Sequence, residues 1–174
     1  MVDLVTKDRI CLVKKGYQGG AVAYHAGTLY YIDSGKRVVR FDVVSQRAHF
    51  VDIPKCRTLA VQGKKLWFIT EKEEADVYYD GEAKPVSGVK SAPTSNIVCG
   101  SKYAFFISKN NKLQCIDSAN LRCQKVKCYD GAEKSVNEPV YNVRVYNEEK
   151  LSLFVSKDQD YEWSLCDYEI EDDK

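Results

Sequence analysis

The two histidines are the side chains best suited to acid–base chemistry near neutral pH, because no other imidazole occurs in the 174 residues. His25 falls in a predicted turn and His49 in a predicted outer strand. The sequence contains no G-x-S-x-G elbow, no H-E-x-x-H pair and no glycine-rich loop leading into a helix. We therefore predict two surface histidines, and a protein that is not an enzyme and has no cofactor.

Seven cysteines are the next candidates, and they lie at positions 11, 56, 99, 115, 123, 128 and 166. Cys115, Cys123 and Cys128 are spaced C-x7-C-x4-C, which matches no common zinc arrangement. Most of the seven lie in strand-like runs, where cysteine is usually a small buried hydrophobe. Because their number is odd and no Asn-x-Ser/Thr acceptor occurs, we expect free cysteines in a reducing, cytoplasmic compartment and no metal site.

The overall charge restricts the possible partners. Twenty-six basic and 25 acidic residues leave a formal net charge of +1, which creates no long-range field toward nucleic acid or an anionic membrane. No run approaches the roughly twenty apolar residues of a membrane span, and the first residues lack the apolar core of a signal peptide. We expect a globular protein that binds neither nucleic acid nor membranes.

Four copies of one strand pattern organise the chain. Each copy is an apolar, aromatic-rich strand that ends in a small polar residue, and the copies align without gaps at spacings of 37, 38 and 48 residues. A second strand follows each copy and is closed by an aspartate, which we expect to cap a turn rather than bind a metal. The copies are Leu29–Asp33, Leu66–Thr70, Ala104–Ser108 and Ser152–Ser156, followed by Asp42, Asp80, Asp117 and Asp167. Such a period, built only of strands and turns, predicts a β-propeller.

The predicted fold class is all-β, a four-bladed propeller of four-stranded antiparallel blades in a single domain over 1–174. We letter the strands of each blade a to d from the axis outward. The blades are expected at 20–54, 57–88, 95–128 and 139–171. The fourth repeat lacks a strand d, and we expect an N-terminal strand at 8–15 to close it as a clasp. A closed ring favours a monomer, and the alternative is a half ring that pairs with a second copy as a homodimer.

The segment Leu29–Asp42, with the sequence LYYIDSGKRVVRFD, resembles the repeat of hemopexin-type four-bladed propellers. The shared features are an aromatic pair, a turn with a glycine and a basic residue, and an Arg-aromatic-Asp close. In length and strand order the resemblance covers all four repeats. The chain departs from that family in lacking the Asp-Ala-Ala signature of strand a and a cysteine pair between the first and last blades. The resemblance implies architecture only.

The connections of variable length are the expected functional surface, since function on a repeat scaffold concentrates in such loops. We predict a non-catalytic protein–protein interaction scaffold within a larger intracellular assembly. The alternative is a small-ligand or ion binder that uses the central channel, lined by Asn96 and Asn142 of strand a. The expected partner-binding residues are Glu73, Glu74, Lys90, Pro93, Asn110, Asn111, Glu133 and Lys134.

Overall fold

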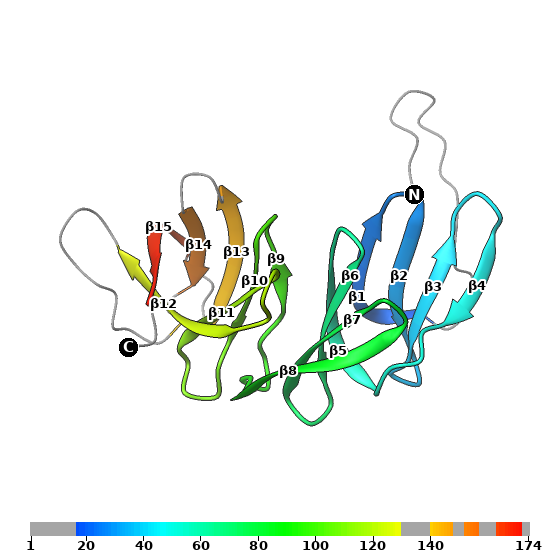
Figure 1. The fold of residues 1–174 in the computed structure, drawn as a ribbon, viewed down its shortest axis with the longest axis horizontal. Helices are drawn as coiled ribbons and strands as arrows, with labels where there is room; N and C mark the ends of the chain where they lie inside the picture. The colour runs from blue at the N-terminus through cyan, green and yellow to red at the C-terminus, as the bar shows by residue number, and fades with distance from the viewer. Residues whose placement is uncertain (1–16, 130–139, 148–151, 157–162, 172–174) are drawn as a thin grey trace.

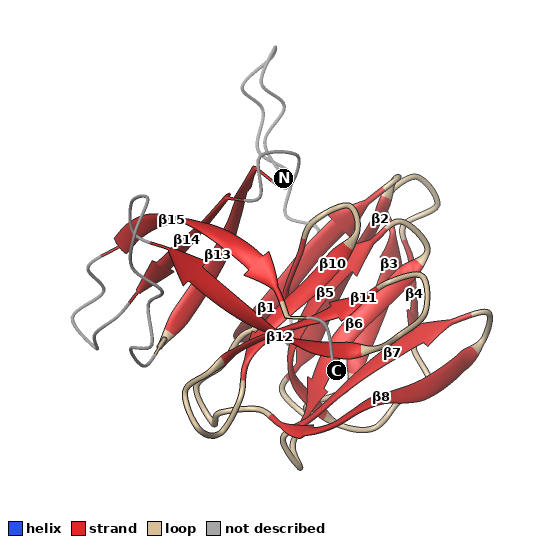
Figure 2. Cartoon of the chain, turned by 60° about the vertical axis from the view of Figure 1, so that its left-hand side comes forward, coloured by secondary structure: helices blue, strands red, loops and turns tan. Residues whose placement is uncertain are grey.

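The computed structural model describes residues 17–129, 140–147, 152–156 and 163–171, which form an all-β structure. In these ranges the strands make three antiparallel sheets, two of four strands and one of seven. We group the strands into four units that follow the four copies of the sequence pattern (Figure 1). The described part consists of strands and loops (Figure 2). No helix of the length and apolarity required to cross a membrane occurs among the described residues.

The first two units are separate four-stranded sheets, and the last two share the seven-stranded sheet. Unit 1 comprises β1 (Tyr17–His25), β2 (Thr28–Asp33), β3 (Val38–Asp42) and β4 (Arg47–Phe50). Unit 2 comprises β5 (Cys56–Gln62), β6 (Lys65–Thr70), β7 (Glu74–Tyr79) and β8 (Glu82–Lys90). Unit 3 comprises β9 (Val98–Cys99), β10 (Tyr103–Ile107), β11 (Leu113–Asp117) and β12 (Cys123–Tyr129), and unit 4 comprises β13 (Asn142–Asn147), β14 (Ser152–Ser156) and β15 (Trp163–Ile170).

Local hydrogen bonds fix the turn after the second strand of units 1, 2 and 3. The Asp33 carboxylate accepts a bond of 2.8 Å from the N–H of Gly35. The Thr70 hydroxyl accepts one of 3.1 Å from the N–H of Glu74, and the Ser108 hydroxyl accepts one of 3.3 Å from the N–H four residues later. Side-chain oxygens that bond to the backbone a few residues on are typical turn formers. The small polar residue of the repeat therefore ends the strand and starts the return.

The aspartates that follow each repeat have the predicted capping role in two units. Asp42 accepts a 2.6 Å bond from the N–H of Ser45, and Asp117 accepts a 2.7 Å bond from the N–H two residues later. Asp80 lies in the tight turn itself, with a left-handed φ of 54°. In unit 4, Asp167 instead lies within β15.

Strand β12 joins units 3 and 4 into one sheet. Its first half pairs with β11, as in Cys115↔Gln124, and its second half pairs with β15, as in Cys128↔Tyr168. The outer edge of β15 is the position that we predicted for the N-terminal strand. Strand β12 pairs with the second half of β15 at this edge, and residues 8–15 lie outside the described residues, so the N-terminal clasp stays a prediction.

Three apolar cores join the units in sequence order. Side chains on a strand alternate between its two faces, so the aromatic second strand of a unit contributes to the core on each side. Burial of such side chains is the main favourable term in folding. The main members are Ile32, Val38, Leu59, Leu66 and Phe68 between units 1 and 2; Trp67, Ile69, Val77, Ala104 and Phe106 between units 2 and 3; and Phe105, Ile107, Leu113, Leu153 and Val155 between units 3 and 4.

The fourth copy of the pattern is displaced by one residue relative to the predicted alignment. In unit 2, Leu66 and Phe68 face the preceding unit. In unit 4, Leu153 and Val155 face the preceding unit, whereas Phe154, which the alignment equated with Phe68, lies on the opposite face. A shift of one residue moves every side chain of a strand to the other face. The predicted equivalence was therefore wrong in this unit.

The four units form an open arc. The first strands β1, β5, β9 and β13 follow one another along its inner side, and unit 1 and unit 4 lie at opposite ends of the long axis (Figure 1). The described residues thus show three sheets in an arc, whereas we predicted four independent blades in a closed ring.

Candidate functional site

Those residues predicted to bind a partner that the structure describes lie on one face of the arc, at or next to the turns between second and third strands and the connections between units. Glu74 and Lys90 form an ion pair of 2.7 Å there, and Glu73 and Lys109 form one of 3.2 Å. The pair Lys36–Glu71, at 3.6 Å, links units 1 and 2 in the same way. We call this surface the loop face. The Glu73–Lys109 and Lys36–Glu71 pairs cross the seams between units, and the Glu74–Lys90 pair lies within unit 2.

Two of the predicted partner-binding residues hold the backbone of this face. The carbonyl oxygen of Glu73 accepts a bond of 2.9 Å from the N–H of Ser91, and that of Asn111 accepts one of 2.9 Å from the N–H of Val140. Both acceptors have a left-handed conformation, with φ of 66° and 55°. Their backbones therefore connect one unit to the next.

The remaining predicted site residues are dispersed. Pro93 and Asn110 are exposed on the loop face. Asn96 is exposed ahead of β9, and the Asn142 side-chain oxygen accepts a bond of 2.9 Å from the N–H of Val143. Glu133 and Lys134 lie outside the described residues.

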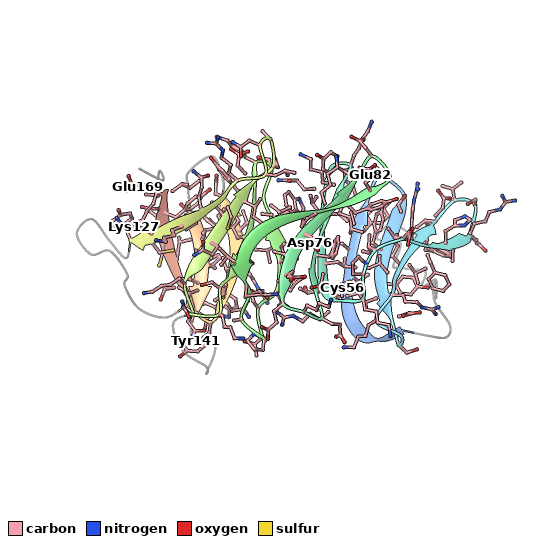
Figure 3. All side chains as sticks on the ribbon, turned by 60° about the horizontal axis from the view of Figure 1, so that its bottom comes forward. Cys56, Asp76, Glu82, Lys127, Tyr141 and Glu169 are labelled. Carbon is pink, nitrogen blue, oxygen red and sulfur yellow. The ribbon has the colours of Figure 1, made fainter. Side chains whose placement is uncertain are left out.

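A shallow groove of about 300 Å³ opens on the loop face between the connection of units 1 and 2 and the third strand of unit 2. Burial, and then the charge of Glu74, raise the pKa of the Asp76 carboxyl, against a hydrogen bond from the backbone of Val86. Asp76 lies in the middle of the arc, far from both ends (Figure 3). The lining residues are Pro54, Lys55, Thr70, Glu71, Lys72, Glu74 and Asp76.

An exposed apolar surface lies on the outer side of unit 4, and we call it the unit-4 end face. Tyr146 and Leu165 expose 59% and 49% of their surface there. The Tyr146 and Phe154 rings meet edge to face at 5.1 Å, and the Arg144 guanidinium lies 4.8 Å from the centre of the Trp163 ring. Strand pairing places Arg144, Phe154 and Leu165 side by side. Our sequence analysis missed this face because the one-residue displacement in unit 4 assigned Phe154 to the core.

Unit 1 has a matching apolar surface on its outer side, the unit-1 end face. Tyr24 and Phe50 expose 62% and 60% of their surface, and the Arg37 guanidinium lies 4.0 Å from the centre of the Phe50 ring. Strand pairing puts the members of this face in register across all four strands of the unit. They are Val22, Tyr24, Leu29, Tyr31, Val39, Phe41, Ala48 and Phe50. The central Tyr31, Val39 and Phe41 are buried and form a core cluster of their own, so the exposed apolar side chains lie only on the edge strands β1 and β4.

The groups that could do acid–base or metal chemistry do not converge in the described ranges. His25 ends β1 and His49 lies in β4, so they occupy opposite edges of one sheet, and both are exposed. Within the residues described, no group of three or more His, Cys, Asp or Glu side chains could hold a metal ion. The six described cysteines are outside any disulfide bond.

No family model matches the chain, and no curated protein matches its sequence. The chain is similar in structure to the computationally designed protein Ika4, with a TM-score of 0.65 and 10% identity over 91% of this chain and 98% of that one. The designed protein Ika8 gives a TM-score of 0.56 and 12% identity over 84% of this chain and 44% of that one. BamB from Moraxella catarrhalis gives a TM-score of 0.56 and 10% identity over 79% of this chain and 41% of that one.

These similarities concern the fold alone, since the identities are low. The chain spans nearly the whole of Ika4 but less than half of Ika8 and of BamB. The resemblance to the hemopexin repeat stays a prediction. The chain is an all-β protein of antiparallel sheets whose structural neighbours are propeller-like.

Proposed function

We propose that this protein is a non-catalytic protein-interaction module that binds a protein partner through the unit-4 end face. The four units are, in this proposal, four consecutive propeller blades. The single observation that carries it is the unit-4 end face, where Tyr146, Phe154, Trp163 and Leu165 gather around Arg144 on an open sheet surface. Aromatic residues and arginine are the types that dominate protein–protein binding energy.

The loop face supports binding less well than the unit-4 end face does. Its charged residues already pair with one another, as Glu73 does with Lys109 and Glu74 with Lys90. Exposed pairs of this kind contribute little, typically about 0 to 1 kcal/mol, and offer a partner few unpaired charges. The wide separation of His25 and His49 favours a role in binding over one in catalysis.

The proposal can be tested by affinity capture with variants of the immobilised protein. Leu165→Arg places a charge in the unit-4 end face, and Val44→Arg is the matched control because Val44 is 90% exposed in a turn of unit 1, away from the unit-4 end face. We expect partner proteins, identified by mass spectrometry, to be lost with Leu165→Arg and kept with Val44→Arg. Partners that are kept by both variants and lost when Glu74 and Lys90 are replaced by alanine would move the binding surface to the loop face.

A further inference from the structure

The unit-1 end face has a buried centre, although it is the outer side of the first sheet. Tyr31, Val39 and Phe41 expose only 8%, 5% and 8% of their surface. They form a core cluster whose other described members, Leu29 and Val43, belong to the same unit. The centre of this face is therefore shielded from solvent without a contribution from the described residues of another unit to its cluster.

A single sheet face does not exclude water from its own central side chains. Side chains stand roughly perpendicular to a sheet, so their outer ends stay accessible until a second layer packs on them. At the junction of units 2 and 3, Trp67 and Phe106 are fully buried because each sheet covers the other. The centre of the unit-1 end face requires a covering layer of the same kind.

The described units do not provide that layer. Unit 2 packs on the other side of unit 1, where Ile32 and Val38 meet Phe68. Units 3 and 4 follow unit 2 along the arc, and unit 4 lies at the far end of the long axis (Figure 1). The exposed fractions of the unit-1 residues are those of one chain by itself, so the layer does not come from a second molecule. It belongs to this chain, outside the described ranges.

Position along the chain singles out residues 1–16. The other stretches outside the described residues adjoin strands of units 3 and 4, at the far end of the arc. Residues 1–16 lead directly into β1, an edge strand of the unit-1 sheet. An extended chain spans about 3.3 Å per residue, so this segment reaches about 50 Å, whereas a four-stranded sheet is about 15 Å wide. The segment is long enough to cross the face and return.

The composition of the segment suits an apolar face. It contains the apolar side chains Val2, Leu4 and Val5, and a continuous apolar run over Ile10–Val13. Burial of these side chains against the aromatic centre of the face removes apolar surface of both layers from water, which is the main favourable term in folding. The segment and the face therefore match in chemical character.

We propose that residues 1–16 pack across the unit-1 end face and close that end of the arc. This places the segment at the opposite end from the clasp on unit 4 that the sequence analysis predicted. The inference goes beyond the proposed function and adds a consequence to it. Because the chain covers one end of the arc itself, the unit-4 end face is the end left open, and one chain binds one partner there.

The first test identifies what lies on the unit-1 end face in the full-length chain. The photoreactive amino acid benzoylphenylalanine replaces Tyr31 in one variant and Phe154, the aromatic residue of the second strand of unit 4, in the matched control. After irradiation, peptide mapping by mass spectrometry should find residues 1–16 linked to position 31 within a single chain of 19.8 kDa, and not linked to position 154.

The absence of a link between position 31 and residues 1–16 would overturn the proposal. A link between position 154 and residues 1–16 would also overturn it, in favour of the clasp on unit 4. A link from position 31 to a second chain, seen as a product of twice the mass, would assign the face to another copy instead.

The second test removes the apolar character of the segment. Ile10→Asp and Leu12→Asp are combined in one variant, and Lys7→Ala and Arg9→Ala are combined in the control. A charged side chain is costly to bury without a partner, so the aspartate variant should uncover the face. We expect it to unfold at a lower urea concentration and to bind more of the apolar dye ANS, and the control to match the wild type in both measurements.

An aspartate variant with the wild-type unfolding midpoint and dye binding would overturn the proposal. The first test keeps the natural segment, so it decides the question even if the aspartate variant does not fold. Failure of either test leaves the proposed function to its own experiment, because capture with Leu165→Arg examines the other end of the arc.

Discussion

The backbone N–H of Cys56 donates a hydrogen bond of 3.0 Å to the carbonyl oxygen of Lys36, which ties the start of unit 2 to a turn of unit 1. The same bond recurs from Ser91 to Glu73 and from Val140 to Asn111, each at 2.9 Å. All three acceptors have a positive φ, although none is glycine. The same backbone bond and the same left-handed conformation thus recur in three units, although the acceptor residues Lys36, Glu73 and Asn111 have different side chains.

Valine at position 111 should destabilise the protein. The left-handed φ of 55° at Asn111 costs a β-branched side chain about 1 to 2 kcal/mol, whereas glycine adopts it freely. We expect Asn111→Val to lower the free energy of unfolding by that amount and Asn111→Gly to leave it nearly unchanged, as measured by urea denaturation. Equal losses for the two variants would mean that the Asn111 side chain, and not its backbone, carries the junction.

The two leucines of unit 4 should respond very differently to truncation. Leu153 is fully buried against unit 3, so Leu153→Ala is expected to cost about 2 to 5 kcal/mol of unfolding free energy. Leu165 lies on the opposite face and is half exposed, so Leu165→Ala should cost less than about 1 kcal/mol in dilute solution, where chains do not associate. Denaturant unfolding of both variants tests the strand register. A larger loss for Leu165→Ala than for Leu153→Ala would instead support the alignment without gaps.

Asp76→Asn should stabilise the protein at neutral pH. Burial raises the pKa of this carboxyl above its ordinary value of 3.8, so the folded state holds the proton over a range in which the unfolded state has released it. The free energy of unfolding therefore falls as the pH rises from the Asp76 pKa of the unfolded state to that of the folded state. Above the folded-state pKa the loss is complete. Asparagine can still accept the bond from Val86, so we expect a gain at neutral pH that disappears below the unfolded pKa.

Glu74→Gln is the control for that pH series because its sign is opposite, and it is made in the Asp76→Asn background because the charge of Glu74 also raises the pKa of Asp76. A hydrogen bond from Lys90 lowers the pKa of Glu74 in the folded state. The stabilisation that Glu74 provides is therefore present above its pKa in the unfolded state, and it is lost as the pH falls through its pKa in the folded state. The substitution should destabilise the protein at neutral pH and have no effect in acid. Thermal unfolding across the pH range measures both variants. A loss of stability with Asp76→Asn at neutral pH would mean that the charged carboxylate has a favourable partner.

The buried thiols should resist alkylation in the folded protein. Burial raises the pKa of both Cys56 and Cys115 to about 12, and the thiolate is the reactive form. Of the six described cysteines, Cys99 and Cys123 are half-buried and should react with a maleimide first. Peptide mapping by mass spectrometry would show this order under native conditions and equal labelling in denaturant. Early labelling of Cys56 would mean that the core between units 1 and 2 opens readily.

The sequence by itself determined the local features of the fold. Strand positions and turns follow from contacts within a few residues, as in the bond from Gly35 to Asp33, and such contacts repeat wherever the residue types repeat. The continuous apolar, aromatic-rich run of the repeat also predicted a buried strand, and Phe68 and Phe105 in it are fully buried. The predicted partner residues Glu73 and Asn111 were correctly placed in turns, but their backbone role depends on the neighbouring unit.

Only the tertiary structure decided how the units are joined. A strand pairs with whichever edge is adjacent in space, so the sequence of β12 did not reveal that its second half pairs with β15. The face on which Phe154 lies depends on a shift of one residue in the strand register. A strand that is apolar on both faces fits either register, so its sequence does not choose between them. The arc and its exposed ends, with Tyr146 at one and Tyr24 at the other, follow from the angles between packed sheets, which no short-range pattern encodes.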